Sequence, residues 1–78
     1  MTPPTIIEQS SAAVAEGVRA MVWRKNVLLL SRGELGKLIG YSPDAVKRFE
    51  RGMAANGRAR LRYRRACAGL SRPTFDWT

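Results

Sequence analysis

The segment from residue 31 to 52 constrains the fold most, because it has the pattern of two short helices separated by a glycine. Ser31 and Glu34 stand at the spacing of a capping box, which predicts the start of the first helix. The apolar residues that follow recur at helical spacing and predict one buried stripe: Leu35, Leu38 and Ile39. Gly40 is expected to end this helix, since glycine adopts the positive φ that a sharp turn needs.

The second helix of the segment is predicted to begin after Ser42 as N-cap, with Pro43 at its first position, and to run to about Arg51. Its inward residues are expected to be Ala45, Val46 and Phe49. Its outward residues are then Asp44, Lys47, Arg48 and Arg51. Two short helices, a tight turn and one polar outer face are typical of a helix-turn-helix motif.

Before this segment, a long helix is predicted from about Ile6 to Arg24 or Lys25, with a start at Ser10 or Ser11 as the alternative. Its apolar residues at helical spacing are Val14, Gly17, Val18, Met21 and Val22. Asn26 is expected to end it, and the run 27–30 is expected to be a buried connector. Residues 1–5 are expected to be flexible.

After a loop over residues 53–57, a fourth helix is predicted from about Arg58 to Gly69. Its inward residues are expected to be Ala59, Tyr63, Ala66, Cys67 and Leu70, with Cys67 as a small buried apolar residue. The arginines Arg60, Arg62, Arg64 and Arg65 are expected to lie outward or along the flanks, as a solvated face or as a surface for an acidic partner. The tail 71–78 carries Phe75 and Trp77, which we expect to dock on the domain or on a second subunit.

The motif around Gly40 resembles the Xre/Cro family of phage-type DNA-binding regulators over about residues 18–70. The residues that carry the resemblance are Leu35, Gly36, Gly40, Ser42, Val46 and the run 48–52. It implies an all-α, lambda repressor-like bundle of four to five helices. A small residue, usually alanine, stands at the place of Gly36 in that family, and glycine is expected to serve at a helix-propensity cost of roughly 1 kcal/mol. The resemblance also pairs Glu50 with a basic residue of the first long helix, expected here to be Lys25.

Carried over by motif position, the residues expected to face DNA bases are Pro43, Asp44, Lys47 and Arg48. Arginine and lysine donate to guanine, and aspartate accepts from cytosine, whereas proline donates nothing. Asp44 has a second interpretation, as an acidic residue facing the positive end of its helix dipole. The expected phosphate contacts flank this helix: Arg32, Ser42, Arg51, Asn56 and Arg58.

The charge and the composition of the chain also favour a nucleic-acid partner. The 78 residues carry a net charge of +8, and nine of the fourteen basic residues lie between Lys47 and Arg72, with Glu50 as the one acid among them. Such a bias implies a polyanionic partner. The chain has one cysteine and no histidine, so we expect neither a metal site, nor a cofactor, nor an enzyme. We expect one domain over residues 1–78, no membrane span, no small-molecule ligand and a cytoplasmic or nucleoid-associated location.

The leading hypothesis is therefore a sequence-specific transcriptional regulator, a repressor or a dual regulator of phage or mobile-element type. It would bind double-stranded DNA at a palindromic or repeated operator as a homodimer, because one recognition helix reads too few base pairs. The alternative is an antitoxin or antiactivator that covers a partner protein with the same fold. A third hypothesis is sequence-independent coating of nucleic acid through the arginine-rich helix.

Overall fold

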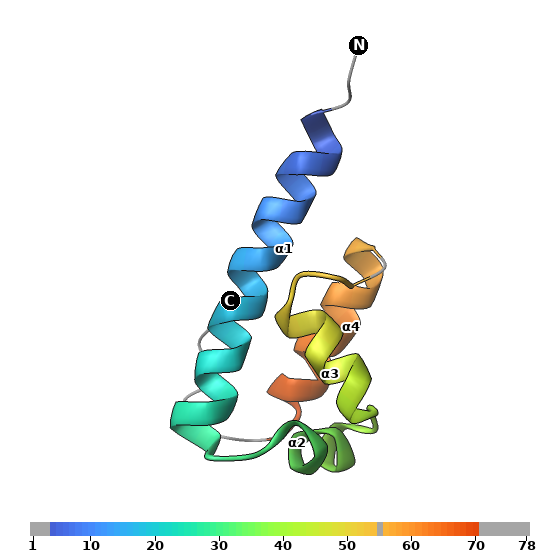
Figure 1. Ribbon diagram of the computed structural model, residues 1–78. Coiled ribbons are helices and arrows are strands. Elements are labelled where there is room, and N and C mark those ends of the chain that lie inside the picture. The colour runs from blue at the N-terminus through green and yellow to red at the C-terminus, as the bar shows by residue number, and fades with distance from the viewer. Residues whose placement is uncertain (1–3, 55, 71–78) are drawn as a thin grey trace.

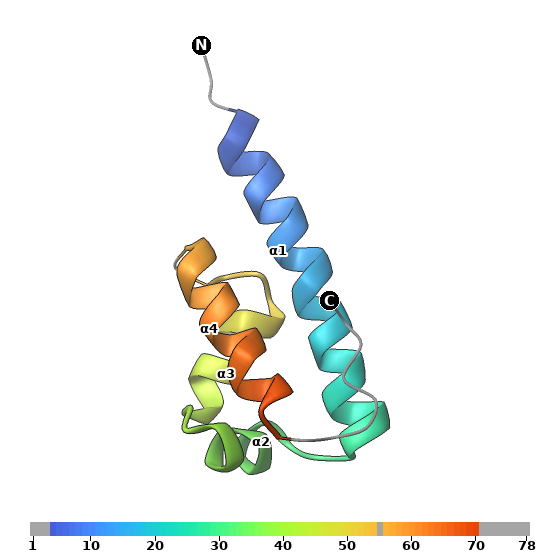
Figure 2. The same ribbon diagram turned by 180° about the vertical axis from the view of Figure 1, so that it is seen from behind.

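The computed structural model describes residues 4–54 and 56–70, with side chains from Ser11 onward, and the regular elements of this part of the chain are all helices. The elements are α1 (Pro4–Val22), the π-helical segment η1 (Trp23–Leu28), α2 (Arg32–Ile39), α3 (Pro43–Glu50) and α4 (Gly57–Ala68). The predicted all-α class is confirmed. α1 is long and straight, and α2, α3 and α4 gather beside its second half (Figures 1 and 2). The aromatic tail 71–78 lies outside the described residues.

The first helix differs from its prediction at both ends. It begins at Pro4, so the predicted start at about Ile6 is two residues late and the alternative start at Ser10 or Ser11 is wrong. Residues 1–3 of the stretch predicted to be flexible lie outside the described residues. The helix does not end at Asn26 either, because the wider turns of η1 continue to Leu28. Leu29 ends them in the left-handed region, with φ 57°, and its N–H donates to the Arg24 carbonyl.

The apolar run after Asn26 is not a buried connector. Val27 is 45% exposed and Leu29 is 77% exposed, whereas Leu28 and Leu30 pack partly against the core. A helical turn followed by one left-handed residue sends successive side chains in different directions. Only two of the four side chains in this run therefore reach the interior.

The local signals of residues 31–42 are confirmed in detail. Ser31 Oγ accepts from the Glu34 N–H at 3.1 Å, and Glu34 Oε1 accepts from the Ser31 N–H at 2.8 Å, which completes the capping box. The hydrogen bonds from Ser31, chiefly the one from its backbone, hold the pKa of Glu34 below its usual value. Gly40 ends α2 with φ 78°, and Ser42 Oγ caps α3 by accepting from the Ala45 N–H at 3.1 Å.

The core lies where α2, α3 and α4 meet the end of α1. Its buried residues are Ala20, Trp23, Leu35, Val46, Phe49, Tyr63 and Cys67. The Phe49 ring stacks on the Tyr63 ring at 3.9 Å between centroids, and Tyr41 meets Tyr63 edge to face at 5.2 Å. Leu38 departs from the predicted stripe, since half of it is exposed. The short α2 therefore anchors mainly through Leu35.

The packing face of α1 consists of small residues, and its valines point outward. Ala13, Gly17 and Ala20 are buried, whereas Val14, Val18 and Val22 are each about 45% exposed. The reason is a close crossing, because a Cβ on Gly17 would lie 2.6 Å from the Phe49 carbonyl oxygen and closer still to that of Glu50. A valine side chain has no room at such a contact. No helix of the described residues is both long and apolar enough to cross a membrane.

Candidate nucleic-acid interface

The first turns of α3 present the four residues predicted to face bases. Pro43, Asp44 and Arg48 are exposed, and Lys47 is partly buried. Arg48 Nε donates to Asp44 Oδ2 at 3.1 Å, with side chains 66% and 70% exposed. A pair this exposed contributes only about 0.3 to 0.5 kcal/mol, so little free energy holds the two side chains together. Both can therefore rearrange toward a ligand.

Glu50, at the end of α3, is buried and accepts hydrogen bonds from Arg24, not from Lys25 as predicted. Arg24 Nε lies 2.5 Å from Glu50 Oε2, and Arg24 Nη2 lies 3.0 Å from Glu50 Oε1. Arg24 Nη1 also donates to the Leu30 carbonyl at 2.8 Å. Lys25 is exposed. Arg24 thus donates to both oxygens of Glu50, a bidentate geometry that lysine cannot provide. This pair ties η1 to α3.

The error in the predicted partner of Glu50 is one of helical phase. Ala13, Gly17, Ala20 and Arg24 follow one another at spacings of four, three and four residues, so they share one face. Lys25 stands one residue further round, off this face, and is exposed. The row of small residues was the sequence signal that could have identified Arg24, because it marks the face of α1 that approaches α3.

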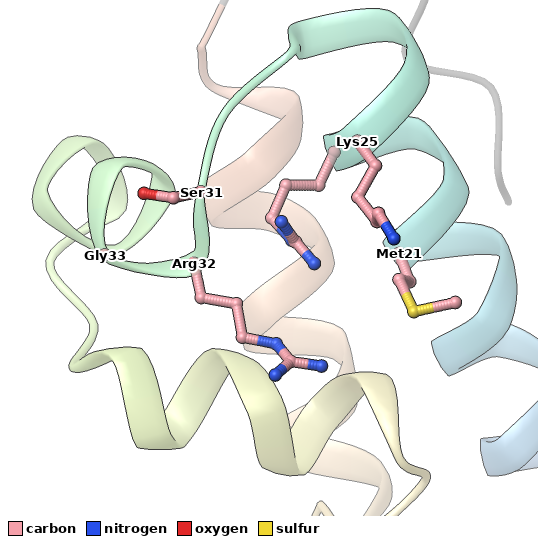
Figure 3. Close-up of a pocket in the computed structure, with 6 residues that line it drawn as sticks. Met21, Lys25, Ser31, Arg32 and Gly33 are labelled. Carbon is pink, nitrogen blue, oxygen red and sulfur yellow. The ribbon is translucent and has the colours of Figure 1, made fainter.

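Arg32, predicted to contact phosphate, also belongs to the buried network. Its Nε donates to Glu50 Oε1 at 3.0 Å, while its side chain stays 35% exposed. Arg32 reaches from the start of α2 toward α3, across an open pocket of about 460 Å³ whose other labelled residues include Lys25, Met21 and Ser31 (Figure 3). Glu50 offsets only part of the positive charge around this pocket. An anion is therefore the ligand that its residues favour.

The other predicted phosphate contacts lie at the ends of helices. Arg51 and Arg58 are exposed, as are the capping residues Ser42 and Asn56. Asn56 Oδ1 accepts from the Ala59 N–H at 2.8 Å and so caps α4. The caps use only acceptor oxygens, so the Ser42 hydroxyl proton and the Asn56 amide group remain available as donors. All of them flank α3 or the start of α4 along the chain.

A second buried carboxylate was missed by sequence reasoning. Glu16 of α1 is 2% exposed and accepts from Arg60 Nε at 2.8 Å and from Arg64 Nη1 at 3.0 Å. Of the four arginines predicted to lie outward or along the flanks of α4, these two therefore lie along the flank that faces α1. No sequence signal joins residues so far apart, except that an acid on the small-residue face of α1 needs a buried cation.

The two buried carboxylates leave the surface strongly positive. Glu16 and Glu50 each face two arginines inside the fold. Among the side chains that the structure describes, the exposed acids are Glu34 and Asp44. Exposed lysines and arginines outnumber them several times over. The described surface is therefore suited to polyanions.

The buried polar groups of the core are not arranged for covalent chemistry. Burial raises the pKa of the Cys67 thiol to about 12, with a smaller rise from Glu50 and an opposing hydrogen bond from Tyr63. Burial likewise raises the pKa of Tyr63, with further contributions from Cys67 and Glu50. Both groups are neutral near pH 7, so the thiol is a poor nucleophile. In the described part of the chain, no three histidine, cysteine or acidic side chains gather to hold a metal ion.

A second hollow, of about 240 Å³, lies between α3 and α4 and is lined mainly by apolar and aromatic side chains such as Tyr41, Phe49 and Met53.

Comparisons with models of protein families, with curated proteins and with solved structures found no match to this chain.

Proposed function

We propose that this protein is a sequence-specific DNA-binding transcriptional regulator of the Xre/Cro type, in which α2 and α3 form a helix-turn-helix and α3 enters the major groove. The observation that carries the proposal is the orientation of α3. Its acid Glu50 and its apolar residues Val46 and Phe49 are buried, while Asp44 and Arg48 are exposed at its first turns. An α-helix with such an outer face matches the width of the major groove and its donor and acceptor pattern.

The anchoring of Glu50 supports this proposal. Arg24 and Arg32 hold the carboxylate from two different elements, so the axis of α3 is fixed relative to η1 and to the start of α2. A recognition helix needs a fixed axis, because base readout depends on hydrogen-bond distances within a few tenths of an ångström. In this proposal Arg32 is a positioning residue first, and only its two Nη groups remain for a phosphate.

Dimerisation is the second part of the proposal, with the solvent face of α1 as the contact. Over residues 11–22 this face carries the three exposed valines and one exposed charge, Arg19. Two copies with a net charge of +8 each repel one another, so they associate best through a surface poor in charge. A two-fold pair of α1 helices buries the valines of both copies. It also provides the second recognition helix that an operator of two half-sites requires.

The test is a fluorescence anisotropy titration of the purified protein with the DNA upstream of its own gene and with a scrambled duplex, at about 150 mM salt. A preference of about a thousandfold or more is expected for a specific regulator. Arg48→Ala should weaken operator binding by about 1 to 3 kcal/mol and relax the preference at one base position. Lys37→Ala removes an exposed charge from α2 and serves as the matched control. Unchanged operator binding by Arg48→Ala would contradict the placement of α3 in the groove.

The alternative function, an antitoxin or antiactivator that covers a partner protein, is favoured by one observation. Val27 and Leu29 are both exposed where η1 ends, and Leu29 adopts a left-handed conformation that is unfavourable for its side chain. Co-purification of a second polypeptide at fixed stoichiometry, lost in Leu29→Asn, would support this function. A homodimer that binds its operator without any partner would count against it.

A further inference from the structure

The five arginines of α4 fall into two groups that the sequence does not separate. Arg60 and Arg64 turn toward α1, where both pair with the buried carboxylate of Glu16. Their positive charges are therefore partly neutralised by Glu16 inside the fold. The remaining three, Arg58, Arg62 and Arg65, are exposed.

The three exposed arginines form a row on one side of α4. Their spacings of four and three residues place them on the same face, with rises of about 6 Å and about 4.5 Å along the axis. The buried residues Tyr63 and Cys67 lie on the other side of the helix. None of the three makes an ion pair with an acidic side chain that the structure describes. Like charges at these spacings repel one another, so the row is stabilised by a partner that supplies negative charge.

The composition of this face favours a phosphate backbone over an acidic protein. Protein interfaces depend on buried apolar or aromatic anchors, and within α4 the one exposed large apolar side chain is that of Leu61, at 37%. Among the described residues of α4, the aromatic side chain is Tyr63, which is buried, so this helix offers no exposed ring on which unpaired bases would stack. Guanidinium groups, by contrast, match the geometry of phosphate oxygens, and a duplex presents phosphates at regular short intervals.

The row stands on a different helix from Asp44 and Arg48. α4 lies behind α3 in Figure 1 and in front of it in Figure 2. We propose that the α4 row, defined as Arg58, Arg62 and Arg65, is a second nucleic-acid surface that binds the phosphates of duplex DNA independently of sequence. This surface does not depend on base readout by α3, so it can operate whether or not an operator exists.

The test compares two variants that lower the net charge by the same amount. Arg62→Gln/Arg65→Gln removes two charges from the row, and Lys37→Glu removes the equivalent of two charges from the exposed surface of α2. Arg58 is left in place because it is also an expected contact at the start of α4. Each variant is titrated with a scrambled duplex from about 50 to about 200 mM salt, in the wild-type and in the Arg48→Ala background. Circular dichroism verifies that both variants stay folded.

The α4 row predicts a specific change in the salt dependence. The slope of log K against log salt is negative, and each lost phosphate contact reduces its magnitude by about 0.9. The double variant should therefore lose about 1.8 from this magnitude, and Lys37→Glu much less. Operator and scrambled DNA should weaken by the same factor, and the loss should persist in the Arg48→Ala background. The comparison in the Arg48→Ala background tests the row independently of α3. If α3 does not recognise an operator, the expected loss of slope in the double variant is still the same.

Three results would overturn the proposal. An unchanged slope in the double variant would mean that the row makes no phosphate contact. Equal changes in the double variant and in Lys37→Glu would mean a general effect of net charge. Tighter binding of polyglutamate than of duplex DNA at the same salt concentration, lost in the double variant, would assign the row to an acidic protein.

Discussion

Replacing Gly36 by alanine tests how closely α2 packs against the turn that follows it. Helix propensity alone predicts that the change stabilises the protein by about 1 kcal/mol. The family resemblance makes the same prediction, because alanine is usual at this place. In the structure, however, a Cβ on Gly36 would overlap the Tyr41 carbonyl oxygen and lie 3.2 Å from the Tyr41 carbonyl carbon.

The overlapping atom belongs to the backbone, so it cannot rotate away as a side chain can. Tyr41 is also held in place, since its N–H donates to the Gly36 carbonyl at 2.8 Å. The cost of the overlap is therefore at the upper end of the usual range for overpacking, about 3 kcal/mol. After the propensity gain of about 1 kcal/mol, a net loss of about 2 kcal/mol remains. For a domain of this size it corresponds to a decrease in Tm of about 8 to 16 °C.

The control is Gly33→Ala in the same helix. A Cβ there would meet Pro43 Cγ at 3.7 Å, which is an ordinary contact, so this change should stabilise the protein by up to about 1 kcal/mol. Thermal unfolding of both variants, followed by circular dichroism at 222 nm, should give Tm changes of opposite sign. An increase in Tm for Gly36→Ala that equals the increase for Gly33→Ala would refute the close packing of α2 on the turn.

Three further predictions follow from the buried network, the core thiol and the valine face. Arg24→Lys should lower the free energy of unfolding by about 1 to 3 kcal/mol, because a single ammonium group cannot span the three acceptors that the guanidinium of Arg24 reaches. The control Lys25→Gln should change it by less than about 0.5 kcal/mol, with both variants measured by urea titration. Because the pKa of Cys67 is raised in the folded protein, the unfolded chain loses its thiol proton at lower pH. The contribution of this thiol to the free energy of unfolding should therefore be fully present below about pH 9 and decrease from there toward pH 12. Cys67→Ala should reduce the part of this decrease that precedes tyrosine ionisation, and an identical decrease in the variant would contradict the assignment. Val18→Asp should shift the protein toward monomer in sedimentation velocity, and an unchanged dimer would place the contact elsewhere.

The helix boundaries between residues 31 and 43 were predictable because their causes are local. The Ser31 and Glu34 capping box, the positive φ of Gly40 and the cap by Ser42 each involve residues within four positions of one another. Such interactions depend on backbone geometry that short segments specify for themselves. The inward orientation of Val46 and Phe49 followed from the helical period alone.

The partners of the buried carboxylates were not predictable in this way. Glu50 was matched with Lys25 by motif position, and only the close crossing of α1 over α3 at Gly17 decided that Arg24 faces it. Glu16 and its two arginines on α4 join residues more than forty positions apart. The sequence by itself determined the two short helices after residue 31, their caps at Ser31, Gly40 and Ser42, and the excess of positive charge. The tertiary structure decided which arginines are neutralised inside and which remain at the surface, because that choice depends on distances between helices that no local pattern specifies.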